Sequence, residues 1–281
     1  MTHASPHATS MLHPSPELRA RLSKVPEVTM YFWIIKVLCT TVGETFADFI
    51  NTKLGDNLNT TTLVMGSLLV VALAVQFRVP EYIPAVYWVA VVLISIVGTL
   101  ITDNMVEHFH VSLATSTIVF GILMLASFAA WYASEKTLSI HSIHTHKREA
   151  FYWTAILFTF ALGTAAGDLI GEQYSLGYFK SVLLFAAIIA LIAVAHAKFH
   201  LNAILAFWGA YVVTRPLGAS IGDLLSQPRK IAPDVDPATF QPGLGLGTTV
   251  TSIIFLTAIL VVVVYMTAVQ RNAPVLIDQT D

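Results

Sequence analysis

The chain has 281 residues, of which 56% are hydrophobic and only 11% charged, and its formal net charge is −2. Soluble domains carry about 25% charged residues, so most of this surface cannot face water, and lipid is the solvent that the composition indicates. The near-neutral charge offers no basic face for nucleic acid, and a single cysteine, Cys39, excludes an internal disulfide and a cysteine-based metal cage.

The first segment, 1–25, is polar and rich in His, Pro and Ser, which predicts a disordered cytoplasmic tail. The segment 26–271 predicts a single transmembrane domain, and 272–281 a short C-terminal tail. Apolar runs long enough to cross a hydrocarbon core of about 30 Å recur along the domain. We expect about eight transmembrane helices, near 28–50, 62–79, 83–103, 112–133, 151–171, 179–197, 201–224 and 248–269, with Pro216 interrupting the seventh.

The basic residues are divided unequally between the two sides of such a bundle. Nine Lys and Arg residues fall on the side of the N-terminal tail and four on the other side, while Lys36 and Arg215 lie within spans. The positive-inside rule then places both termini in the cytoplasm. Together with the helical spans, this predicts a multi-pass membrane protein.

A pattern of an aromatic residue, Trp, nine residues, Gly, four residues and Asp occurs four times. It predicts an all-α helix bundle of four repeated parallel two-helix units, about 28–79, 83–133, 151–197 and 201–269, each made of one span and a return span. The copies are Phe32-Trp33…Gly43…Asp48, Tyr87-Trp88…Gly98…Asp103, Tyr152-Trp153…Gly163…Asp168 and Phe207-Trp208…Gly218…Asp223.

Two parts of the pattern have a structural interpretation. The aromatic pairs are expected at the cytoplasmic interface, where amphipathic rings anchor spans. Each glycine is followed four residues later by a second small residue, which lets helix backbones approach closely in lipid. We therefore expect the odd-numbered spans to cross one another or their partners at Gly43/Ala47, Gly98/Thr102, Gly163/Gly167 and Gly218/Gly222.

The four aspartates are the main functional signal. An ionisable group within a span costs roughly 2.5–3.5 kcal/mol on insertion scales, so four of them at one depth predict a shared polar cavity. Span 1 and span 7 add charged groups, and threonines occupy the position of Glu44 in copies two and three. The alternative is structural: the aspartates cap helices or pair with Lys36 and Arg215. The candidate substrate- or ion-binding residues are Asp48, Asp103, Asp168, Asp223, Glu44, Thr99, Thr164, Lys36 and Arg215.

Carboxylates with hydroxyls and carbonyls form a hard oxygen environment, which suits Mg²⁺, Ca²⁺, Mn²⁺, Na⁺ or a relayed proton. We expect no resident cofactor apart from a bound divalent cation. If a metal is the substrate, the oxygen-rich set favours Mn²⁺ over Zn²⁺ or Cu⁺. The metal ligands would be Asp48, Asp103, Asp168 and Asp223.

Most histidines fall on the predicted cytoplasmic side. His141, His144 and His146 lie in the 134–150 loop, and His196 and His200 share one helical face. Imidazoles at i and i+4 can bind a transition metal, so these histidines form either a metal-collecting vestibule or a set of solvated loop residues.

The segment Lys24-Val25-Pro26-Glu27-Val28-Thr29, with Phe32-Trp33-Ile34-Ile35-Lys36 and Gly43-Glu44-Thr45-Phe46-Ala47-Asp48, resembles a bacterial family of multi-pass proteins labelled uncharacterised membrane-anchored protein. The likeness extends over most of 24–270. It implies a helical fold in a bacterial inner membrane and supplies no catalytic or binding residues.

Three functions compete on this sequence. The first is a transporter or channel for a small cation, metal or proton, which repeats and intramembrane carboxylates favour. The second is a non-transporting scaffold or sensor. The third is an intramembrane enzyme, which we do not expect because the sequence has no HExxH or GxSxG motif. The expected partners are the lipid bilayer and a small cation or proton, without nucleic acid, and a homo-oligomer stays open.

Overall fold

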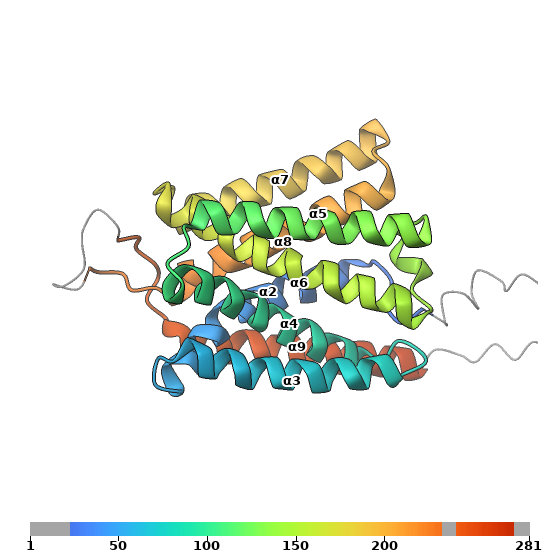
Figure 1. The fold of residues 1–281 in the computed structure, drawn as a ribbon, viewed down its shortest axis with the longest axis horizontal. Helices are drawn as coiled ribbons and strands as arrows, with labels where there is room; N and C mark the ends of the chain where they lie inside the picture. The colour runs from blue at the N-terminus through green and yellow to red at the C-terminus, as the bar shows by residue number, and fades with distance from the viewer. Residues whose placement is uncertain (1–22, 232–239, 273–281) are drawn as a thin grey trace, which may run out of the picture.

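The computed structural model describes residues 23–231 and 240–272, with side chains described as far as Val269. Both predicted tails, 1–25 and 272–281, fall almost entirely outside these residues. The described part contains eight long helices, one for each predicted span, labelled as in Figure 1. They are α2 (Met30–Lys53), α3 (Leu58–Arg78), α4 (Pro84–Asp103), α5 (Leu113–Glu135), α6 (His146–Asp168), α7 (Tyr178–Phe199), α8 (Ala203–Ser226) and α9 (Gly247–Asn272).

Seven of these helices, α3 to α9, are long and apolar enough to cross a membrane. Helix α2 does not meet this standard because Lys36, Glu44 and Asp48 lie within it. It packs against α4, α8 and α9, so Lys36 and Glu44 are enclosed by protein. We expected about eight spans, and the described residues form eight long helices. Seven of these are by themselves apolar enough to cross a membrane.

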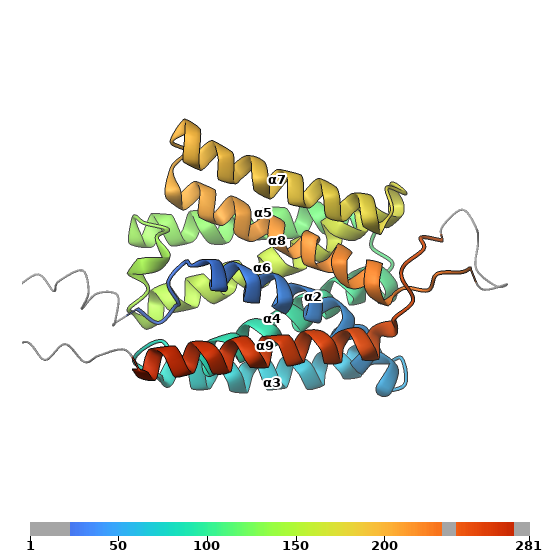
Figure 2. The ribbon, with the colours of Figure 1, turned by 180° about the vertical axis from the view of Figure 1, so that it is seen from behind.

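The helices form two layers (Figures 1 and 2). The inner layer is a closed ring: α2 packs against α4, α4 against α6, α6 against α8, and α8 against α2. These are the helices that carry the four copies of the repeat. The first and last described residues lie at the same end of the bundle, as an even number of antiparallel crossings requires.

The outer helices pair differently from the sequence repeat. Helix α3 packs on α4, α5 on α6 and α7 on α8, so each outer helix lies mainly on the inner helix that follows it. Helix α9 packs on α2 and closes the circle. The two-helix unit of the sequence, a span and its return, is therefore not the packing unit, because α3 lies on α4 rather than mainly on α2.

Local sequence explains where the helices begin and how α8 continues. The side chains of Asn57 and Ser112 accept hydrogen bonds from the first turns of α3 and α5, satisfying backbone donors that have no helical partner. Pro84 occupies the first turn of α4, where its missing N–H costs nothing. Helix α8 runs through Pro216, where we predicted an interruption, since tight packing against the glycines of α6 holds it in place.

The repeat glycines lie where neighbouring inner helices touch. A Cβ atom added at any of the four would collide with a neighbouring inner helix. The side chain that it would meet lies seven positions after the Trp of the neighbouring helix. The predicted close approach therefore occurs between the inner helices, and the same contact is made four times around the ring. Gly43 meets Ser95, Gly98 meets Phe160, Gly163 meets Arg215, and Gly218 meets Thr40.

The aromatic pairs form a belt inside the protein. Trp88, Trp153 and Trp208 are buried, and Trp33 is half-buried. They therefore do not face outward as interface anchors, because each packs on the aromatic residue of the preceding copy. The centroid distances are 5.7 Å for Phe32–Trp88, 5.5 Å for Tyr87–Trp153, 6.2 Å for Tyr152–Trp208 and 5.7 Å for Phe207–Trp33.

The last residues of the predicted tail are folded against the bundle. Lys24 is buried, and its Nζ donates to Glu149 Oε2 at 2.7 Å and to the carbonyl of Phe77 at 3.0 Å. Gln76 Nε2 donates to the other oxygen of the same carboxylate at 3.0 Å. Lys24, which the sequence assigned to the disordered tail 1–25, is therefore part of a buried ion pair.

Replacing Gly98 with Ala tests the close packing of the ring. The new Cβ would lie 2.7 Å from Phe160 Cβ, which cannot rotate away, so we expect a loss of about 1–3 kcal/mol in unfolding free energy. The control is Gly66→Ala on α3, where a Cβ meets nothing within 4 Å and the helix propensity of Ala is higher. SDS titration of the purified protein measures both, and equal stability of the two variants would contradict the packing argument.

Candidate functional site

The repeat register stacks polar residues along the axis of the inner ring. Counted from each Trp, positions three, seven, eleven and fifteen lie about one helical turn apart on one face. All members of the first three layers are buried. The layers are Lys36, Val91, Ile156 and Tyr211; then Thr40, Ser95, Phe160 and Arg215; then Glu44, Thr99, Thr164 and Ala219; and last Asp48, Asp103, Asp168 and Asp223.

Arg215 lies at the centre of this stack and is completely buried. One terminal nitrogen of its guanidinium, Nη2, donates to Glu44 Oε2 at 2.8 Å and to Thr164 Oγ1 at 2.6 Å, and it also donates to Thr99 Oγ1. The other, Nη1, donates to the carbonyl of Thr40 at 2.6 Å. A single side chain of α8 therefore binds α2, α4 and α6.

The ion pair between Arg215 and Glu44 joins two of the predicted candidates. Thr99 and Thr164, which occupy the position of Glu44 in copies two and three, are the hydroxyls that complete the guanidinium's partners. A buried cation needs such satisfied geometry, since its desolvation costs several kcal/mol. The structure thus brings Glu44, Thr99, Thr164 and Arg215 together as one cluster.

Lys36 lies one layer further along the axis and is also completely buried. Its Nζ lies 4.1 Å from the centre of the Tyr211 ring and 4.3 Å from that of Phe160. Among the described residues this nitrogen has no hydrogen-bond partner. The contacts with two aromatic faces are therefore its only direct stabilisation in the described part of the chain.

The four aspartates form the layer at the other side of Arg215. Asp223 is buried, and the other three are half-buried. The four aspartates hold the same position of the repeat, about one helical turn beyond Glu44, and their sharing of one polar cavity stays a prediction.

Two further acids join this layer and were not predicted. Helices α4 and α6 each continue beyond the aspartate as a π-helical turn, Asn104–His108 and Leu169–Gln173. Glu107 and Glu172 lie in these turns, and Glu172 Oε1 accepts a hydrogen bond from Tyr178 at 2.9 Å. Both follow an aspartate by four residues, a spacing that could have identified them in the sequence. Single π turns occur frequently at functional sites.

The aspartates do not form a metal-ligand cluster as they lie here. Residues 23–231 and 240–269 contain no group of three or more His, Cys, Asp or Glu side chains arranged to hold a metal ion. Metal ligation by the four aspartates stays a prediction. Metal binding by the histidines also stays a prediction. In this structure His196 Nδ1 is bonded to the carbonyl of Leu201 at 2.8 Å.

Replacing Arg215 with Met tests the central cluster. Glu44 would keep its burial and lose its ionic partner, so we expect a loss of about 3–5 kcal/mol in unfolding free energy. The double variant Glu44→Gln/Arg215→Met removes both charges and should recover most of this loss. SDS titration measures both; a single variant as stable as the unmodified protein, or a double variant less stable than the single, would contradict the pairing.

Comparison with known proteins finds one match. Four segments of the chain, 31–82, 86–137, 151–200 and 206–272, match a family model described as Repeat of Unknown Function (DUF347). Each segment begins near one inner helix and extends through the outer helix that follows, as the sequence repeat does. No curated protein and no solved structure matches the chain.

Proposed function

The chain belongs to this repeat family, whose description assigns no activity, and from the geometry of its inner ring we propose a membrane transporter or channel for a small cation. The observation that carries the proposal is the set of carboxylates around Arg215. Asp48, Asp103, Asp168 and Asp223 follow the level of Glu44 by about one helical turn, and Glu44 already binds the guanidinium.

The acidic layer supplies the attraction for a cation. Half-buried carboxylates bordered by protein of low dielectric raise the local concentration of cations at this end of the inner ring. Glu107 and Glu172 extend this acidic surface from the two π turns. Groups of this kind within spans are costly to keep, and they commonly mark ion pathways.

Arg215 then competes with the arriving cation for the same oxygen ligands. Its guanidinium is bound by one carboxylate, two hydroxyls and two backbone carbonyls, all oxygen ligands of the kind that a hard cation prefers. A cation that reaches Glu44 must displace Arg215 from it. In this structure Arg215 is bound to Glu44, so we assign the structure to a closed state of the proposed pathway.

The opposite end of the ring is closed by aromatic residues. The Tyr87 and Tyr152 hydroxyls are hydrogen-bonded to each other, and Phe32 packs on Phe207 with 5.9 Å between ring centroids. Passage would require this belt to separate. The proposal therefore includes a second conformation in which the belt opens and Arg215 moves.

We propose Mn²⁺ as the first substrate to test, with a proton as the alternative cation or coupling ion. Oxygen-rich sites suit Mn²⁺, and the carboxylates of the aspartate layer can also carry protons. We propose a bacterial inner membrane as the location, with both termini cytoplasmic.

A scaffold without transport is the second candidate. The continuous packing of the inner ring at its glycines favours a rigid bundle. Flux separates the two, because a scaffold passes no ion after reconstitution whichever aspartate is changed.

Replacing Asp103 with Asn tests the transport proposal. Removing one carboxylate from the aspartate layer should lower Mn²⁺ flux into proteoliposomes on the order of tenfold, because the local cation concentration falls. Flux is followed with an entrapped metal-sensitive dye, alongside parallel measurements of proton and Na⁺ uptake. The control is Glu81→Gln, an exposed acid in the loop between α3 and α4, which should keep full flux. Reconstituted protein that passes none of these ions would overturn the proposal.

Cysteine labelling tests the orientation. The native Cys39 is buried, so it leaves a low background. Tyr174→Cys, in the exposed connection at the aspartate end, should react with a membrane-impermeant maleimide on intact cells. Glu81→Cys, at the other end, should react only after the membrane is permeabilised. The reverse pattern would place both termini outside.

A further inference from the structure

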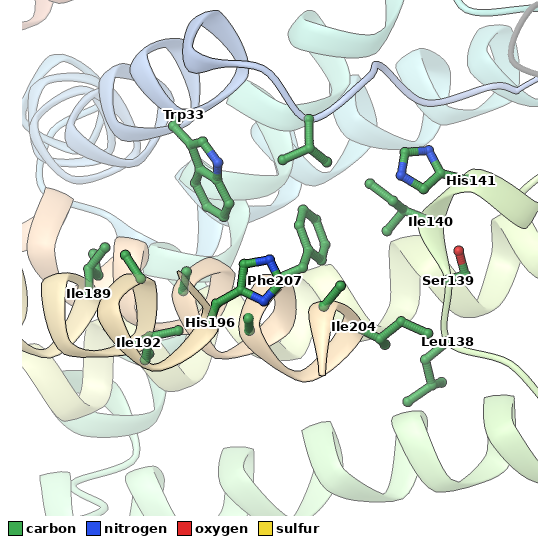
Figure 3. Close-up of a pocket in the computed structure, with 15 residues that line it drawn as sticks. Trp33, Leu138, Ser139, Ile140, His141, Ile189, Ile192, His196, Ile204 and Phe207 are labelled. Atoms are coloured by element: carbon green, nitrogen blue, oxygen red, sulfur yellow. The ribbon is translucent and has the colours of Figure 1, made fainter. Parts of the chain in front are cut away.

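A cavity separate from the charged axis lies at the end of the bundle where the aromatic belt is found. Its volume is about 530 Å³, within the range of ligand pockets, and it lies between α2, α7, α8 and the loop 138–141 (Figure 3). Trp33 and Phe207 point into it from opposite helices. Most of the lining is aliphatic, including Ile189, Ile192 and Ile204.

The few polar groups of the cavity come from α7 and the loop. His196 lies on α7, and Ser139 and His141 lie in the loop that borders the cavity (Figure 3). The bond from His196 Nδ1 to the Leu201 carbonyl fixes the ring and assigns the proton to Nδ1. Nε2 of the neutral ring is then an acceptor, and protonation would make it a donor.

The surroundings of the cavity indicate what enters it. Helix α7 forms one wall, and its outward side chains, including Leu183, Leu191 and Val194, are exposed. If the bundle spans a membrane as proposed above, this exposed face contacts acyl chains, and the same chains are the apolar material nearest to the cavity.

Charge favours one class of lipid. The basic residues Lys136 and Lys198 belong to the same end of the bundle as the cavity, at the C-cap of α5 and in the last turn of α7, whereas Lys147 and Arg148 in the first turn of α6 are paired with Glu135. Basic residues at a membrane surface attract anionic headgroups. A zwitterionic headgroup would gain less from them.

We infer that this cavity binds one acyl chain of an anionic phospholipid, with the headgroup at His196 and His141. The inference rests on the proposed membrane location and not on the identity of the transported ion. The wall of the cavity continues to the charged axis, because the Phe207 ring packs at 5.6 Å from that of Tyr211, which in turn contacts Lys36. A bound chain therefore touches the residues that hold the aromatic belt closed.

The test uses the full chain in vesicles containing phosphatidylglycerol with a photoreactive acyl chain. We expect crosslinks concentrated in 189–210, and Ala193→Trp, which fills the cavity, should reduce them at least fivefold. The matched control is Ala187→Trp, an exposed alanine of the same helix outside the residues that line this cavity. A matching zwitterionic probe should label 189–210 more weakly, and His196→Leu should reduce that difference.

Equal labelling of 189–210 in the unmodified protein and Ala193→Trp, or labelling spread evenly over all outer helices, would overturn the inference and leave only surface lipid. Elution volume and SDS titration establish that both Trp variants are folded; if Ala193→Trp is not, Ala193→Phe replaces it. Labelling without ion flux would support the lipid site and remove the transport proposal, whereas flux without specific labelling would remove only the lipid site.

Discussion

The close approach of the four inner helices at their glycines is the constraint on which the rest of the structure depends. At each contact a glycine of one helix admits the side chain that follows the next copy's Trp by seven positions. If the bundle lies in lipid as proposed, there is little hydrophobic force between its helices, and small residues with close packing hold it together. This packing brings Arg215 of α8 within hydrogen-bonding distance of three other helices.

The chemistry arises where the four copies differ. At position seven the copies carry Thr40, Ser95, Phe160 and Arg215, and only the last is charged. At position eleven only Glu44 is charged, and it is the partner of Arg215. A symmetric scaffold thus carries one asymmetric ion pair on its axis. The aspartates, by contrast, are present in all four copies, at the position one helical turn beyond Glu44.

The outer helices do a different job from the inner ones. Their exposed side chains are mostly apolar, and each covers the inner helix that follows it. The charged axis is therefore separated from the surroundings by two layers of helix. The cavity beside Trp33 and Phe207 lies between the outer helix α7 and two inner helices, and two histidines belong to its mostly apolar lining. A site for an ion inside and a site for a lipid chain outside can thus coexist in one ring, joined through Phe207 and Tyr211.

The sequence alone determined the number and order of the helices, the fourfold repeat and nearly every residue of the charged axis. It could do so because apolar length, the Trp–Gly–Asp spacing and the rarity of charges within spans are local properties of the chain. Only the tertiary structure decided how the pieces meet. In the tertiary structure the Trp residues are buried in a belt, α3 packs on α4, and α9 packs on α2. Arg215 pairs with Glu44 rather than with an aspartate. These outcomes depend on which helix faces which neighbour, and spacing along one chain cannot fix that, because several packings satisfy the same periodicity. Glu107 and Glu172 lay outside the prediction because they join the acidic layer from turns beyond the regular helices.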